Sequence, residues 1–252
     1  MVDGTPGDGR VPHRVDGGVT DARAVALTPD PVPADGADVL DAYGPRPFWR
    51  GRVHLIAALV TLPAALLLLL SAHTASGRAA VAVYALSLIG LFSVSASYHR
   101  LARTPTAVKW FRRADHSMIF VLIAGTYTPI CLLALPPAWG IPLLVVVWGA
   151  ALTGVALKMM KLGNGPGNAG SWLYIVIGWA AVAALPALWS SLDGVQLALL
   201  AIGGLLFTVG AVVLARRWPD PLPRTFGYHE VWHAMTVAAA GCHFALIALV
   251  VK

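Results

Sequence analysis

The chain has 252 residues, of which 58% are hydrophobic and only 12% are charged, and its mean hydropathy is +0.72. A soluble domain carries roughly 25% charged residues, so this composition excludes an ordinary soluble protein and predicts an integral membrane protein. The net charge of +6 comes from basic residues spread between apolar segments, so no nucleic acid partner is expected.

The first 45 residues differ in composition from the rest of the chain. They are rich in Gly, Pro, Asp and Ala and hold eight of the twelve acidic residues, with almost no aromatic residues. This composition predicts a disordered tail over residues 1–45. The tail lacks the features of a secretory signal peptide, so the first apolar helix is expected to enter the membrane uncleaved.

The remainder, residues 46–252, is predicted to be a membrane domain. It contains seven apolar segments, each about 20 residues long and therefore able to cross about 30 Å of hydrocarbon. The expected segments are Val53–Ala72, Ala79–Tyr98, His116–Leu135, Trp139–Leu157, Ser171–Ser191, Val195–Ala215 and His229–Val251. The predicted fold is an all-α bundle of seven transmembrane helices.

The basic residues predict the orientation of this bundle. With a cytoplasmic N terminus, thirteen Lys and Arg residues of the membrane domain lie on the cytoplasmic side, and only Arg78 and Lys252 lie outside. Lys and Arg in short loops favour the cytoplasmic side. We therefore expect a multi-pass protein of the cell inner (plasma) membrane, with its N terminus in the cytoplasm and its C terminus outside.

Four carboxylates occur beyond the tail, and two of them are unusual. Asp193 and Asp220 lie in turn sequences, where solvation explains them. Asp115 and Glu230 instead lie at the start of apolar segments, where a charged group is costly. The sequence therefore marks Asp115 and Glu230 as candidates for a functional site.

Histidines gather at the same predicted membrane face. On a helix, His229 and His233 lie about 6 Å apart along the axis and about 40° apart around it, so both project from one face. His99 ends the second segment, which the topology brings to the same side. The three imidazoles can therefore converge, with Asp115 and Ser95 close by.

Three imidazoles that leave one position open are typical of a catalytic zinc site, whereas structural zinc usually has four protein ligands. The alternative is that each polar residue has a local role. His99 would then lie at the membrane interface, Ser95 would bond its own helix, and Asp115 would cap a helix or pair with Arg112.

Three sequence blocks, and a fourth at the start of the membrane domain, resemble those of a known family. The three are Ser95-Ala-Ser-Tyr-His99-Arg100, the stretch from Arg113-Ala-Asp115-His116 to Gly125-Thr-Tyr-Thr-Pro129, and His229-Glu-Val-Trp-His233 with Ala238-Ala-Ala-Gly-Cys-His243. They look like the signature blocks of the hemolysin III family, the bacterial branch of the progestin and adipoQ receptor family, which includes the adiponectin receptors. Arg50-Gly-Arg-Val-His54 is similar to that family's opening block.

The resemblance implies a Zn²⁺ ion held by His99, His229 and His233, with Asp115 and Ser95 beside the zinc-bound water. Related families are amide hydrolases that act on ceramides, so it also implies a ceramidase-like, zinc-dependent hydrolase of a lipid amide or ester in membrane lipid homeostasis. The partner is then a membrane lipid with a fatty-acyl chain. In this chemistry Asp115 accepts a proton, and Ser95 orients the water or donates to a developing oxyanion.

Two other functions stay open. The family name refers to a pore-like cytolytic activity, and a receptor-like protein with a structural zinc is also compatible with the motifs. A pore needs a polar path, but the middle of the apolar segments is mainly Leu, Val, Ala and Gly, apart from His243. His243 lies roughly 21 Å beyond His229 by helical rise, so it cannot share the metal, and we expect a hydrogen-bonded core histidine. His54 and His116 are expected at the interface or behind the site.

Overall fold

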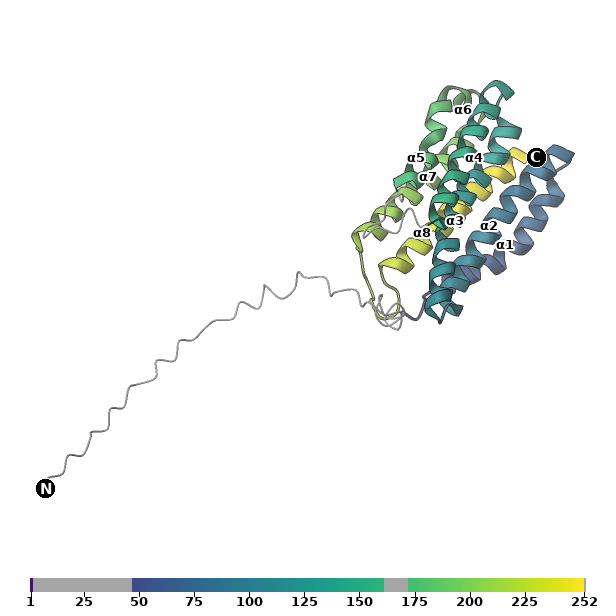
Figure 1. The fold of residues 1–252 in the computed structure, drawn as a ribbon. Coiled ribbons are helices and arrows are strands. Elements are labelled where there is room, and N and C mark those ends of the chain that lie inside the picture. Colours follow the sequence, from purple (N-terminus) through teal and green to yellow (C-terminus); the bar gives the residue numbers. More distant parts are fainter. Residues whose placement is uncertain (2–46, 161–171, 252) are drawn as a thin grey trace. The chain divides into compact units, whose positions relative to one another are not determined.

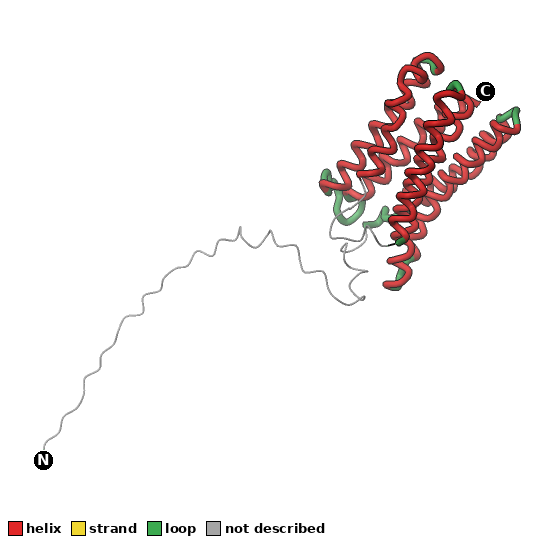
Figure 2. Tube along the Cα trace, turned by 45° about the horizontal axis from the view of Figure 1, so that its top comes forward, coloured by secondary structure: helices red, strands yellow, loops and turns green. Residues whose placement is uncertain are grey.

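The computed structural model describes residue 1, residues 47–160 and residues 172–251. The predicted tail, apart from its first residue, and residues 161–171, which include the expected start of the fifth segment at Ser171, lie outside this part. Within it the chain is helical (Figures 1 and 2), and β-structure is limited to one isolated bridge between Leu222 and Phe226.

Seven helical spans are long and apolar enough to cross a membrane, and each corresponds to one expected segment. The spans are α1 (Arg52–Ser71), α2 (Ala75–Leu101), α3 with a π-helical end η3 (Pro105–Pro129 and Ile130–Ala134), α4 (Pro137–Met159), the series α5, η4 and α6 (Trp172–Gly178, Trp179–Ala184 and Leu185–Ser191), α7 (Gly194–Arg216) and α8 (Tyr228–Val251). The all-α seven-helix architecture is therefore confirmed. The orientation of the termini stays a prediction.

Helix α3 begins at Pro105 rather than at His116, so the predicted start was wrong. The Thr104 hydroxyl caps it by accepting a backbone hydrogen bond of 3.2 Å from the first turn, and proline is favoured at the first helical position. The charged residues between 109 and 115 interrupt the apolar pattern but do not prevent a helix. Asp115 therefore lies well inside α3, and it is not a capping residue.

The fifth span is not a continuous α-helix. It changes to a 3₁₀ helix at Trp179 and returns to α-helix at Leu185, which leaves backbone groups without their helical partners. The Tyr127 hydroxyl of α3 donates to the Gly178 carbonyl at 2.8 Å and accepts from the Ala181 N–H at 2.7 Å. One side chain thus satisfies both sides of the break, as an apolar surrounding requires.

Helix α8, yellow in Figure 1, packs against α7, α1 and α3. Helices α1, α2, α3 and α4 pack in sequence, each against the next. Direct backbone contact between α2 and α8 is marginal among the described residues. The polar residues at the end of α2 and at the start of α8 are therefore brought together through α1 and α3.

Candidate metal centre

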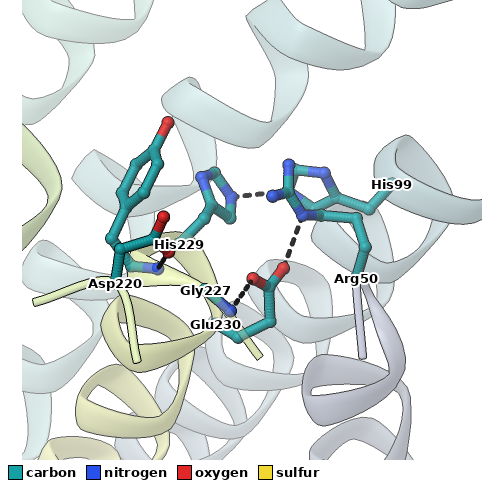
Figure 3. Close-up of polar contacts among 7 residues, drawn as sticks. Arg50, His99, Asp220, Gly227, His229 and Glu230 are labelled. Atoms are coloured by element: carbon teal, nitrogen blue, oxygen red, sulfur yellow. Dashed lines mark hydrogen bonds and ion pairs between the residues drawn. The ribbon is translucent and has the colours of Figure 1, made fainter. Parts of the chain in front are cut away.

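Three histidines from two helices converge at one end of the bundle. His99 lies in the last turn of α2, and His229 and His233 lie in the first two turns of α8. One nitrogen of each ring lies within 4.8 Å of the others, and the Nε2 atoms of His99 and His229 are 3.2 Å apart (Figure 3). His99 and His233 are buried and His229 is half-buried. The spacing of His229 and His233, together with the predicted topology for His99, had indicated this grouping.

The three rings are inclined to one another rather than stacked. The His99 ring makes interplanar angles of 78° with His229 and 56° with His233, and the angle between His229 and His233 is 63°. In addition, His233 Nδ1 is buried without a hydrogen-bond partner among the residues described. Buried polar atoms are nearly always paired, and an ion or water is a common partner where the protein supplies none. The group can hold a metal ion.

Ser95 and Asp115 lie beside the histidines and interact with each other. Ser95 is buried on α2, and its hydroxyl is close enough to the Asp115 carboxylate of α3 to interact with it. Both residues line the cavity that His229 and His233 also line. Ser95 and Asp115 thus lie next to, but outside, the three-histidine group.

A cavity of about 150 Å³ extends from this polar end into the bundle. Its wall follows α8 from His229 through Thr236 to His243, and α3, α5 and α7 contribute mainly apolar side chains such as Ile119 and Phe207. Among the described lining residues none is Lys or Arg, and Asp115 is the one carboxylate. The cavity thus joins a polar end to a largely apolar interior.

His54 on α1 also belongs to this region, although the sequence placed it only at the interface or behind the site. It is 3% exposed, and its ring stacks on that of His233 with centroids 3.9 Å apart and an interplanar angle of 10°. An imidazole binds a metal in its own ring plane, so two parallel stacked rings cannot direct nitrogens at the same ion. His54 therefore supports His233 and is not a fourth ligand in this arrangement. The sequence signal that could have indicated this role for His54 was its position in the block Arg50-Gly-Arg-Val-His54.

Glu230 has a role that its sequence position did not reveal. Its Oε2 accepts the Gly227 N–H at 3.0 Å, and its Oε1 accepts a hydrogen bond from Arg50 Nε in a 2.5 Å ion pair (Figure 3). Asp220, expected in a solvated turn, is exposed and accepts the Tyr228 N–H at 2.8 Å. Both acidic residues thus accept hydrogen bonds from backbone N–H groups at the start of α8. The first N–H groups of a helix have no acceptor within the helix itself.

His243 lies away from the three-histidine group, as helical rise predicts. Its Nε2 is 3.3 Å from the Leu200 carbonyl of α7, and the ring packs against Gly203, where an added Cβ would overlap it. The expectation of a hydrogen-bonded core histidine is confirmed. The ring also lines the far part of the cavity.

The fold and site define a helical protein with seven apolar spans and a buried histidine group able to hold a metal. A family model described as Haemolysin-III related matches residues 44–244. The chain is 34% identical over 194 residues to Hemolysin-3 of Bacillus cereus, covering 76% of this chain and 85% of that protein. It is 31% identical over 194 residues to the Hemolysin-3 homolog of Bacillus subtilis (strain 168), covering 76% and 87%. The chain belongs to the hemolysin III family, and it is a multi-pass membrane protein.

Proposed function

We propose that this protein is a zinc-dependent hydrolase of an amide or ester bond in a membrane lipid. The observation that carries the proposal is the convergence of His99, His229 and His233 beside Asp115, at the polar end of a cavity with apolar walls. A metal group, a proton acceptor and an apolar binding space are the parts that hydrolysis of a lipid requires.

The donor set suits zinc. Zinc binds imidazole nitrogens at about 2.0–2.1 Å, so two nitrogens of a tetrahedral site lie about 3.3–3.4 Å apart. The separation of 3.2 Å between the Nε2 atoms of His99 and His229 is close to that value, and His233 would supply the third nitrogen. Three protein ligands leave a position for substrate. When bound, zinc acts as a Lewis acid and activates water at neutral pH.

Asp115 and Ser95 have separate roles in this proposal. An Asp115 carboxylate oxygen accepts the proton that the attacking water loses. The Ser95 hydroxyl, which lies beside that carboxylate, would donate a hydrogen bond to it and keep it oriented. Because this role uses the Ser95 proton, we assign Ser95 to orientation of the proton acceptor rather than to stabilisation of an oxyanion.

The cavity supports a lipid as the substrate. Apolar walls suit a fatty-acyl chain, and the carbonyl to be cleaved would lie next to Asp115 and His233. The cavity wall has no described cation, which favours a substrate whose buried part is uncharged. We place the protein in the cell inner (plasma) membrane, with the histidine group at the cytoplasmic face, because most basic residues of the domain fall on that side.

The proposal is tested by replacing Asp115 with Asn in the full chain, reconstituted in lipid and loaded with zinc. Wild type should release fatty acid from an amide or ester lipid, measured by mass spectrometry, and Asp115→Asn should lose this activity while keeping its zinc. Asp193→Asn is the control, since it makes the same change at a helix cap where Asn also caps well. If Asp115→Asn is as active as Asp193→Asn, Asp115 is not the proton acceptor. If wild type releases nothing, the hydrolase proposal fails and a structural metal becomes the better account.

A membrane pore is the second candidate, because both relatives carry the name hemolysin. A pore needs a continuous polar path across the bundle. The walls of the cavity are mainly apolar beyond its histidine end, which favours the hydrolase.

A further inference from the structure

The histidines of the metal centre come from two helices whose backbones have little direct contact. His99 is on α2 and His229 is on α8, and these two helices have only marginal backbone contact in the described structure, whereas α1 packs against both. The backbone positions of the two histidines are therefore set largely through other elements, although their side chains meet directly. Metal sites need such support, because ligands must be held close to the productive geometry.

The segment before α1, residues 47–51, contacts the chain on the α8 side. The N–H of Phe48 donates to the Arg224 carbonyl at 3.2 Å, and the N–H of Trp49 donates to the Thr225 carbonyl at 3.1 Å. Residues 224 and 225 belong to the loop that leads into α8. The segment is thereby joined through its backbone to the entrance of the helix that carries His229.

The same segment also lies directly against His99. Gly51 has a positive φ of 74°, which favours glycine, and a Cβ added there would lie 2.8 Å from His99 Cβ. Any larger residue would push against the base of the His99 side chain. Residues 47–51 thus contact both the base of the His99 side chain and the loop that leads into the helix carrying His229.

Arg50 makes the strongest of these contacts. Its guanidinium pairs with Glu230, whose carboxylate is 0% exposed and whose second oxygen accepts the Gly227 N–H. Both carboxylate oxygens are engaged, and Glu230 is the chain neighbour of His229 (Figure 3). A buried ion pair contributes little to net stability compared with apolar residues of the same volume. The pair is better explained by the precise placement that two directed contacts give.

We propose that Arg50 and Glu230 are positioning residues for the metal centre. Their ion pair fixes the first turn of α8 against the segment 47–51, and so holds His229 opposite His99. Neither residue belongs to the three-histidine group. The inference rests on the proposed function in that it needs the histidine group to bind a metal.

The test measures metal binding directly. The full chain is purified in detergent, its metal is removed with a chelator, and Zn²⁺ is titrated against a competing chelator. Arg50→Gln and Glu230→Gln should each weaken Zn²⁺ binding by about 10- to 100-fold, which is the usual effect of replacing a residue that supports a metal ligand. The visible spectrum of the Co²⁺-loaded variants should differ from that of wild type, because this spectrum reports ligand geometry. The double variant should have about the same Zn²⁺ affinity as the single variant that binds Zn²⁺ less tightly, since Arg50 and Glu230 act through one contact.

A matched control separates positioning from stability. Trp148→Phe removes the 3.1 Å hydrogen bond from Trp148 Nε1 to Thr128 Oγ1, between α4 and α3. It should lower thermal stability and leave Zn²⁺ affinity and the Co²⁺ spectrum unchanged. If the Arg50 and Glu230 variants behave like this control, the pair is only structural and the inference is wrong.

Three further outcomes are decisive. If Arg50→Gln does not fold, Glu230→Gln decides, because it removes the ion pair from the α8 side; wild-type affinity in Glu230→Gln would overturn the positioning role. If wild type binds no Zn²⁺, the proposed function fails and this inference falls with it. Normal wild-type binding with unaffected variants refutes the inference alone.

Discussion

The break in the fifth span allows a sharp test of the structure, because one hydroxyl satisfies it. Tyr127→Phe removes only the oxygen that donates to the Gly178 carbonyl and accepts from the Ala181 N–H. Leaving a buried polar group unpaired costs about 1–3 kcal/mol, but hydrogen bonds between membrane helices average only about 0.6 kcal/mol. With two groups stranded at once, we expect a loss of about 1–3 kcal/mol in the free energy of unfolding.

The matched comparison is Tyr84→Phe, which makes the same chemical change in a different surrounding. The Tyr84 side chain is 1% exposed, and its hydroxyl has no partner among the residues that the structure describes. Removing an unsatisfied buried hydroxyl should leave stability unchanged or raise it. Unfolding midpoints in mixed micelles of increasing SDS content measure both variants. Equal losses for the two variants, or no loss for Tyr127→Phe, would refute the role given to Tyr127.

Three other predictions address topology, function and packing. A topology reporter fused after Arg103 should be active only in the cytoplasm, and one fused after Lys252 only outside it; the opposite pattern would reverse the orientation. Purified protein should not release dye from liposomes of non-hydrolysable ether lipids, because the cavity lacks a polar path; robust leakage without zinc would favour the pore. Gly203→Ala should destabilise the protein by about 1–3 kcal/mol by overlapping the His243 ring, whereas Gly204→Ala, with open space around its added Cβ, should not; similar losses in unfolding assays would contradict the packing at His243.

Local pattern was enough to predict the spans and the histidine group. Each apolar segment appears as one helical span, because length and hydrophobicity decide whether a helix suits a bilayer. The four-residue spacing of His229 and His233 predicted a shared face, and His99 joined them through the predicted topology. The start of α3 was missed because the prediction followed hydropathy, and the first part of this helix contains charged residues. Thr104 and Pro105 nevertheless form an ordinary helix start.

The supporting contacts could not be predicted, because they depend on tertiary packing. Arg50 and Glu230 are separated by 180 positions in the chain, and no local pattern pairs them. The stacking of His54 on His233 likewise requires the packing of α1 against α8. The change to a 3₁₀ helix near Trp179 is stabilised by Tyr127 from another helix, so the fifth segment alone does not predict it.

The central claim is that His99, His229 and His233 bind one zinc ion, and metal analysis of the purified full chain tests it most directly. Wild type should contain about one zinc per chain, as one site with three imidazole ligands requires. At limiting zinc, replacing any of the three histidines with Ala should lower occupancy about tenfold or more. His73→Ala is the control, since His73 is exposed in the turn between α1 and α2. It should keep the metal, and equal zinc content in wild type and in the variant lacking all three site histidines would contradict the account.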